Sequence, residues 1–545
     1  MTTEPSFIEV FLDGLAKGPA KAHVTEIHGP TPKPFDGAAL LELVARARGA
    51  LRARGVRPGD RVGLLAANSA QWVAADVALL AEGAIVVPLY ARQEPAELAG
   101  MLRDAGATLV VASTEALASA LGAHLPGVPA CLFAELFAGE PVREPAAARA
   151  PGDCVTIVYT SGTSGEPKGV MITRAGVDHM LPVTRDSLRD LMGAQAGQDR
   201  LFHYLPFCFM GSRIVLWTAL FRGSGILVST SLENLVEEMK TARPHYFLNV
   251  PALLERIKKG VEGKLATQPA PVRALYARGL AAAQRTAAGQ ASLVDRAALA
   301  LAQRVVFAKI RAQIGPELVC LICGSAPLHP DTQRWFETLG IPVYQVYGLT
   351  ETTAIVTMDV PGHAVPGRVG TAIRGVEMKL GEGDELLVRG PNIFAGYWQR
   401  PEATATALAD GWFHTGDQCG LDARGNLEVI GRVGNILVAE SGHNIAPEPI
   451  ETKLVAELPG AEHCVVLGHG RPYLAAIVTG KVTADEVQGA IDRVNETLPH
   501  YRRVRRFHVS AEPLTIESGL LTANQKLRRK AIEKHYAAAV KELYA

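Results

Sequence analysis

Residues 159–173 combine more features suited to phosphate binding than any other stretch of this chain. Gly162 and Gly165 permit backbone angles and close approaches that a Cβ would forbid, so the amides of such a loop can wrap a polyphosphate. Lys168 supplies a cation, and four side chains add hydroxyl groups: Thr160, Ser161, Thr163 and Ser164. The lysine of a P-loop NTPase precedes Ser or Thr, whereas Gly169 follows here, so a different nucleotide chemistry is indicated. A flexible surface turn is the alternative, since glycine-rich loops are common.

Further polar groups follow two apolar, strand-like runs, residues 318–322 and 343–346. Open α/β sheets bind ligands where strands end, so these groups are candidates for a nucleotide site. Glu351 ends the second unit and could instead be a solvated surface acid. Further on, Asp417 could accept both hydroxyls of a ribose, and Arg432 could donate to ribose or phosphate. The alternative for this pair is an ordinary exposed ion pair.

The pattern Tyr-Thr-Ser-Gly-Thr-Ser-Gly-x-Pro-Lys-Gly at 159–169 closely resembles the signature of the adenylate-forming superfamily. That superfamily includes acyl-CoA synthetases, firefly luciferase and the adenylation domains of peptide synthetases. The resemblance continues in order to Lys526 and implies that the glycine-rich loop binds ATP. By the same resemblance, two segments form the walls of the adenine pocket, with Thr350 near the phosphates: Gly324, Ser325 and Ala326, and Gln345, Val346, Tyr347 and Gly348.

The resemblance also implies the catalytic residues. Lys526, within residues 516–528, stands at the catalytic position of the long-chain enzymes, and Lys168 acts on the phosphates. Glu351 matches the acid that holds Mg²⁺, and Thr160 is the second expected metal ligand. A lysine in a basic run is normally only solvated, so the role of Lys526 depends on the flanking match.

Three other sites are expected from the resemblance. The acyl pocket is lined by Phe207, Phe209 and Met210, although such aromatic residues usually fill cores; Phe209 replaces a frequent histidine and makes the pocket more apolar. The loop that meets the pantetheine arm of CoA contains Ser441, Gly442 and His443. The hinge lies at Gly434, where relatives usually carry Asp or Lys; glycine can still turn the chain, but a charged contact is lost.

Two domains are expected to position these residues, because a chain of 545 residues is longer than a single domain with one hydrophobic core usually is. Helical and strand patterns alternate over residues 40–111, which is typical of a mostly parallel α/β sheet. Residues 135–153 should form a connecting loop, and residues 274–314 should be helical. The resemblance implies a large, multi-sheet adenylation domain of the acyl-CoA synthetase/luciferase type at 1–432. A small, mobile α+β domain should occupy 433–545.

Composition limits the partners and the compartment. Lys plus Arg equals Asp plus Glu at 55 each, so no global field attracts nucleic acid. The N-terminus lacks the basic region of a secretory signal, and the most apolar run is too short to span a bilayer, so we expect a cytoplasmic protein. The pair Cys320 and Cys323 lies in a strand-like run without a second Cys/His pair nearby, which disfavours zinc. Four clustered arginines could bind CoA phosphates or be a solvated face: Arg502, Arg503, Arg505 and Arg506.

Together, the residues and the resemblance predict an ATP-dependent acyl-CoA synthetase that uses Mg²⁺ and coenzyme A. It would convert a fatty acid to acyl-AMP and then to acyl-CoA, releasing pyrophosphate and AMP. A long-chain acid is expected, because several long-chain enzymes carry a helical segment like residues 274–314. The partners should be small molecules, while the exact acid, the oligomeric state and peripheral membrane association are left open. The alternatives are an acyl-AMP ligase that loads a carrier protein and a nucleotide-binding regulator without turnover.

Overall fold

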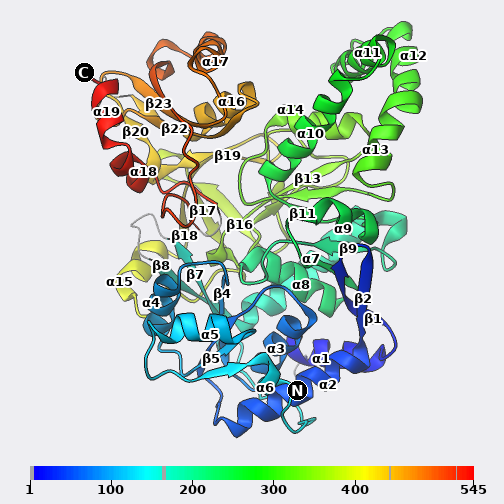
Figure 1. The fold of residues 1–545 in the computed structure, drawn as a ribbon, viewed down its shortest axis with the longest axis vertical. Helices are drawn as coiled ribbons and strands as arrows, with labels where there is room; N and C mark the ends of the chain where they lie inside the picture. Colours follow the sequence, from blue (N-terminus) through cyan, green and yellow to red (C-terminus); the bar gives the residue numbers. More distant parts are fainter. Residues whose placement is uncertain (1–4, 162–166, 441–442, 523–524) are drawn as a thin grey trace.

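The computed structural model describes residues 5–161, 167–440, 443–522 and 525–545. Several mixed sheets form the larger part of the molecule, and the C-terminal residues, orange to red in Figure 1, form a smaller part beside them. Among the described residues, no helix has the length and apolar character needed to cross a membrane.

The sheet that carries the glycine-rich segment has six strands in the order β6-β5-β3-β4-β7-β8. All neighbouring pairs are parallel except β7 and β8, which form an antiparallel pair. The strands are β3 Arg61–Leu65, β4 Ile85–Leu89, β5 Leu109–Ala112, β6 Ala130–Leu132, β7 Cys154–Ser161 and β8 Pro167–Thr173. The intervening helices are α2 Gly37–Ala53, α3 Ala70–Ala81, α4 Pro95–Ala105 and α5 Glu115–Gly122. The predicted parallel alternation is therefore confirmed. The connection at 135–153 is irregular except for its first two residues, which end α6 Phe133–Leu136.

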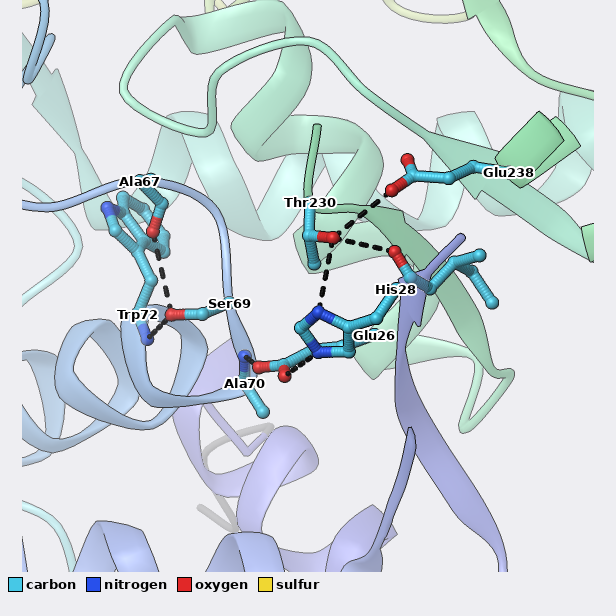
Figure 2. A network of polar contacts seen from close by, with 9 residues as sticks. Glu26, His28, Ala67, Ser69, Ala70, Trp72, Thr230 and Glu238 are labelled. Carbon is cyan, nitrogen blue, oxygen red and sulfur yellow. Dashed lines mark hydrogen bonds and ion pairs between the residues drawn. The ribbon is translucent and has the colours of Figure 1, made fainter. Parts of the chain in front are cut away.

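A second sheet has the order β2-β1-β10-β9. Its strands are β1 Ala22–His28, β2 Thr31–Asp36, β9 Leu201–His203 and β10 Ile226–Ser229. Figure 2 shows how polar groups attach it to α3: Glu26 accepts the N–H of Ala70 at 2.9 Å, and His28 lies 3.1 Å from Glu26. Thr230 lies 3.3 Å from His28 and donates to Glu238, which belongs to α9 Leu235–Ala242. The Glu26–Ala70 contact therefore joins this sheet to α3, and Thr230 joins it to α9.

Two further sheets carry the remaining site residues of the large domain. One has the order β11-β12-β13-β14-β15 and the other the order β16-β17-β18-β19. The first comprises β11 Leu248–Asn249, β12 Leu321–Cys323, β13 Val343–Tyr347, β14 Thr357–Met358 and β15 Thr371–Ala372. The second comprises β16 Glu377–Leu380, β17 Glu385–Arg389, β18 Phe413–Leu421 and β19 Leu427–Arg432. Cys320 and Cys323 are buried free thiols, and burial raises the pKa of both.

The predicted helical segment at 274–314 is confirmed, but a turn at 288–292 divides it into a hairpin. Its first arm is α11 Ala270–Ala287. The second arm comprises α12 Leu293–Ala302, the π-helical turn Gln303–Phe307 and α13 Ala308–Ile314. The hydroxyl of Ser292 accepts the N–H of Asp295, and the Asp295 carboxylate accepts the N–H of Ser292. This capping box starts the second arm.

The C-terminal segment is α+β, as predicted. Among its described residues, a sheet in the order β22-β23-β24 and a two-stranded pair, β20-β21, are combined with four α-helices. The strands are β20 Leu437–Val438, β21 Asn444–Ile445, β22 Ala461–Leu467, β23 Leu474–Gly480 and β24 Val504–Ser510. The helices are α16 Glu448–Glu457, α17 Ala484–Glu496, α18 Arg529–His535 and α19 Ala537–Leu543. Buried apolar clusters made only of residues after 436 give this part its own core.

Candidate active site

The β7–β8 hairpin brings Thr160 and Lys168 together. Its antiparallel register pairs Thr160 with Lys168 and Tyr159 with Gly169. Glycine is required at 169, because a Cβ there would lie 2.7 Å from a methyl group of Ile157. The predicted loop residues Gly162, Thr163 and Gly165 lie outside the described residues, and Ser161 is described by its backbone only. The predicted strand pair is confirmed, so the cation and a hydroxyl flank the ends of this loop.

Tyr397 connects Lys168 to Glu351. The ammonium of Lys168 lies over the ring of Tyr397, 5.1 Å from its centroid, and the Tyr397 hydroxyl donates to Oε1 of Glu351 at 2.9 Å. The segment of Tyr397 is fixed along β8, because Trp398 donates its backbone N–H to the oxygen of Gly169 at 2.7 Å. Burial and the charge of Glu351 raise the pKa of Tyr397, so its hydroxyl remains a donor.

Glu351 lies in a tight turn that directly follows β13. The turn includes the 3₁₀ segment Thr350–Thr352, and a Cβ on Gly348 would collide with the carbonyl oxygen of Ala354. Phe394 donates its backbone N–H to the oxygen of Glu351 at 2.8 Å. The compact turn therefore places Thr350 and Glu351 at the carboxyl end of the strand.

The two segments expected to form an adenine pocket lie side by side, since β12 and β13 are parallel neighbours. Gly324 packs so closely on Val346 that a Cβ would lie 2.8 Å from its methyl group. Ser325, with φ of 72°, and Ala326 are exposed.

The side chain of Gln345 points away from these groups. It is buried, and its amide donates to Oε1 of Gln333 at 2.8 Å and to the oxygen of Arg368 at 2.9 Å. Its backbone is engaged by Asp359, which accepts the N–H of Gln345 at 2.7 Å and donates its own N–H to the Gln345 oxygen at 2.9 Å. The side chain of Gln345 is therefore directed away from the expected nucleotide site. Alternation along a strand explains this result, because neighbouring side chains face opposite sides of a sheet.

Asp417 and Arg432 form a partly buried pair with Tyr347. The register of β18 and β19 sets Asp417 opposite Arg432, whose Nε donates to Oδ1 at 2.8 Å. The Tyr347 hydroxyl donates to Oδ2 of Asp417 at 2.6 Å. Burial and this carboxylate raise the pKa of Tyr347 well above its usual value. Asp417 is only 5% exposed. The alternative that Asp417 and Arg432 form an ordinary exposed ion pair is therefore wrong for Asp417.

Lys526 faces this group from the C-terminal segment. Its backbone is held in a turn, with its N–H donating to Oγ1 of Thr522 at 3.1 Å and its carbonyl accepting from Thr522 N at 2.8 Å. Lys526 is exposed to solvent overall, although protein atoms surround its ammonium. Desolvation and repulsion by Arg432 lower the pKa of Lys526, while Asp417 and Glu351 oppose that change. Residues of both parts of the molecule therefore share one electrostatic environment.

A pocket lies between the large domain and the C-terminal segment. Its lining includes Tyr90, Tyr159, Thr160, Phe209, Thr522 and Arg528. Arg528 also reaches Glu97 of α4 at 3.4 Å. Of the three residues expected to line an acyl pocket, Phe209 is the one that lines this pocket, 5.7 Å from the ring of Tyr90.

The other two expected acyl-pocket residues belong to the core. Phe207 is fully buried, stacks on His203 with 5.1 Å between ring centroids and contacts Trp72. Met210 is 2% exposed at the start of α8 Met210–Phe221. Phe207 and Met210 are therefore packed in the core of this structure, and their expected place in an acyl pocket stays a prediction.

The expected CoA loop and hinge are only partly described. His443 is exposed and stacks on Tyr501, with ring centroids 4.2 Å apart, whereas Ser441 and Gly442 lie outside the described residues. Gly434 lies in the 3₁₀ turn Val433–Asn435, where a Cβ would meet no described atom within 4 Å. The observed backbone therefore does not itself require glycine at 434.

The oxygen atoms of Glu351 and Thr160 fit Mg²⁺, which prefers hard oxygen ligands. Glu351 Oε1 is engaged by Tyr397, which orients the carboxylate. Among the described residues, no cluster of three or more His, Cys, Asp or Glu side chains could hold a metal by itself. Substrate phosphates would have to supply most of the remaining ligands, as they commonly do for this ion.

Sequence comparisons match both parts of the chain. The family described as "AMP-binding enzyme" matches residues 20–398, and the family described as "AMP-binding enzyme C-terminal domain" matches residues 434–545. A long-chain-fatty-acid–CoA ligase of Mycobacterium bovis is 28% identical, over 90% of this chain and 89% of that protein.

Solved structures show the same fold over nearly the whole length. The anthranilate CoA ligase AuaEII, in complex with anthranoyl-AMP, has a TM-score of 0.77 and 20% identity, covering 98% of each chain. The o-succinylbenzoate CoA synthetase of Bacillus subtilis, in complex with its acyl-adenylate, has a TM-score of 0.76 and 20% identity, covering 98% of this chain and 99% of that one.

Proposed function

The chain belongs to the AMP-binding enzyme family, and we propose that it is an ATP-dependent, AMP-forming acyl-CoA synthetase acting on long-chain fatty acids. The observation that carries this proposal is the position of Lys526. This lysine lies in the segment between Thr522 and Arg528, which line one pocket together with Tyr159 and Thr160 of the large domain. The charges of Glu351, Asp417 and Arg432 are close enough to affect the pKa of Lys526. Such an arrangement suits a reaction in which charge develops on phosphoryl oxygens.

In the first half-reaction, the fatty carboxylate attacks the α-phosphorus of ATP and pyrophosphate leaves. Catalysis then consists chiefly of positioning and charge neutralisation. Asp417 accepts the ribose hydroxyls, while Lys168 and Lys526 neutralise the phosphates. Glu351 and Thr160 would hold Mg²⁺, which lowers the cost of the negative charge that gathers on the phosphates. Tyr397 orients Glu351 through its hydrogen bond.

In the second half-reaction, the CoA thiol attacks the acyl carbonyl and AMP leaves. We propose that the C-terminal domain, residues 433–545, rotates about Gly434 between the two steps. The loop at 441–443 would then meet the pantetheine arm. The separate core of the C-terminal domain supports this movement as a unit.

A long, apolar acid is favoured by two observations. Phe209 gives the pocket an aromatic lining, and the relative from M. bovis is named for long-chain substrates. The test is ATP consumption, measured as AMP and pyrophosphate, over a series of carboxylic acids of increasing chain length, with and without CoA.

The proposal predicts CoA-dependent AMP release that is highest with long-chain acids. Pyrophosphate release without any use of CoA would instead favour an acyl-AMP ligase for a carrier protein. Nucleotide binding without turnover on any acid would favour a regulator. A preference for short or aryl acids would overturn the substrate class and leave the reaction type standing.

A further inference from the structure

The helical hairpin at residues 270–314 projects from the edge of the large domain, at the upper right of Figure 1. Its second arm runs through α12, the π-helical turn and α13 as one nearly continuous helix of residues 293–314. At 1.5 Å per residue this arm is about 33 Å long. None of the site residues discussed above lies in this hairpin, which the proposed reaction therefore leaves without a role.

The hairpin is strongly basic within a chain of balanced charge. The whole chain has 55 basic and 55 acidic residues, whereas the hairpin has a single acid, Asp295. Its basic residues are all exposed: Arg273, Arg278, Arg285, Arg296, Arg304, Lys309 and Arg311. Arg285 pairs with Asp295 at 2.5 Å, and none of the others forms an ion pair with a residue that the structure describes. A local positive field is thus built on a neutral protein.

The second arm also exposes large apolar side chains. Leu293 is 82% exposed, Val294 60%, Leu301 53% and Val305 40%. Leu301 follows Val294 by seven residues and Leu293 by eight, and Val305 follows Val294 by eleven. These spacings set the four side chains along one broad face of a helix. The opposite face is buried against the first arm of the hairpin and the core of the large domain, through Ala302, Val306, Phe307 and Ile310. The exposed apolar side chains are therefore separate from those that the hairpin contributes to the core.

Basic residues accompany this apolar face. Arg296, Arg304, Lys309 and Arg311 are exposed on the same arm, between and beyond the exposed apolar side chains along the sequence. This is the pattern of a helix that lies in a membrane interface, with its apolar side chains among the acyl chains and its cations among the head groups.

We propose that the second arm of the hairpin docks on the surface of an anionic lipid bilayer. Leucine and valine side chains would enter the acyl boundary, and the arginines would contact lipid phosphates. The charge argues against a second copy of this chain on the same face, because two such faces would bring like charges together. The hairpin projects from the molecule (Figure 1). A projecting element suits a lipid surface, which adapts to side chains, better than it suits a preformed acidic groove on a protein.

The test is sedimentation of the full-length protein with vesicles. One set contains phosphatidylcholine alone, and the other contains phosphatidylcholine and phosphatidylglycerol in equal amounts. Each basic side chain near an anionic surface contributes a factor of about five. Replacing Arg296, Arg304 and Arg311 by Glu should therefore lower binding by at least about a hundredfold, and raising the salt from about 0.1 M to about 1 M should release the wild type.

Matched variants distinguish binding through this surface from non-specific binding to vesicles. Leu293→Ser with Leu301→Ser should weaken binding to the anionic vesicles, whereas Leu232→Ser with Val236→Ser, at sites that are 42% and 63% exposed on another element, should not. Changing Arg502, Arg505 and Arg506 to Glu is the charge control. Unchanged thermal unfolding midpoints would show that the hairpin variants fold.

The proposal is supported by anionic-vesicle binding that both hairpin variants lose and both controls keep. Three results would overturn it. The first is no sedimentation with either vesicle. The second is equal loss in the control variants. The third is loss with the arginine variant but not the leucine variant, which would mean simple attraction to a polyanion and would leave an acidic protein as the partner of this surface. Because the readout is binding alone, it does not depend on whether the proposed enzyme activity is correct.

Discussion

The hydroxyl of Tyr397 donates to Oε1 of Glu351 at 2.9 Å, and the same ring lies beneath the ammonium of Lys168. One aromatic side chain thus contacts both the cation of the glycine-rich hairpin and the acid that follows β13. Its own position is fixed by backbone pairing with β8, including an isolated bridge to Val170. The relative position of Lys168 and Glu351 therefore depends on Tyr397.

Tyr397→Phe should impair the use of Mg²⁺ more than the binding of ATP. The change removes the hydrogen bond to Glu351 and keeps the ring below Lys168. Loss of a hydrogen bond to a charged group costs about 2 kcal/mol, or roughly thirtyfold in rate. Pyrophosphate exchange as a function of Mg²⁺ concentration measures the effect. Tyr397→Leu, which also removes the ring, should be worse; a Mg²⁺ dependence identical to wild type in Tyr397→Phe would exclude the positioning role.

Glu351→Gln keeps the shape of the side chain but removes the charge that should hold Mg²⁺. We expect adenylation to fall by at least about a hundredfold, as for other single groups that stabilise developing charge, and excess Mg²⁺ to restore it only partly. The exposed Glu402→Gln serves as the control. Turnover that is unchanged at low Mg²⁺ would remove Glu351 from the metal site.

Gly434 tests the proposed hinge. Proline fixes φ near one value, so Gly434→Pro should trap one orientation of the C-terminal domain and block one half-reaction while sparing the other. Gly434→Asp should be tolerated, because a side chain at 434 has open space in this structure. Both half-reactions are assayed separately on the two variants. If Gly434→Pro slows neither of them, or Gly434→Asp abolishes both, the hinge lies elsewhere.

Asp359 should make stability fall as the pH rises toward neutrality. Burial raises the pKa of this carboxyl to about 7, and one oxygen accepts the N–H of Gln345 at 2.7 Å. Between its unfolded pKa, near 4, and about 7, the folded protein holds a proton that the unfolded chain has released, so rising pH favours unfolding. Thermal unfolding midpoints at pH 5 and pH 8 should therefore differ less in Asp359→Asn than in wild type. An equal difference in the two proteins would show that Asp359 does not titrate in this range.

Local patterns predicted the backbone of the site well. The β-branched run before the glycines and the apolar run after Lys168 form the paired strands β7 and β8. Asp417 and Arg432 also meet, although nine strand positions and the turn at 422–426 separate them, because an antiparallel register sets them opposite each other. These results depend on neighbours in sequence or in one hairpin, which single-sequence patterns describe directly.

Side-chain direction was less predictable. Gln345 turns toward Gln333, and Phe207 and Met210 pack in the core, because contacts from distant elements decide which face of a strand or helix is buried. Tyr397 was missed altogether. Its partners lie far away in the sequence, and a Gly-Tyr-Trp run gives no local indication of a polar role. The pairing of residues 395–398 with β8 is a tertiary feature that only the structure reveals.

We propose that Lys526 completes the adenylation site from the C-terminal domain. The most direct test is Lys526→Ala, with Lys530→Ala, a second exposed lysine of the same segment, as the control. Pyrophosphate exchange reports the first half-reaction, and acyl-CoA formation from supplied acyl-AMP reports the second. We predict that Lys526→Ala lowers the first by about a hundredfold or more and leaves the second near wild type, with Lys530→Ala unaffected in both. Wild-type exchange in Lys526→Ala, or an equal loss of both half-reactions, would contradict the account.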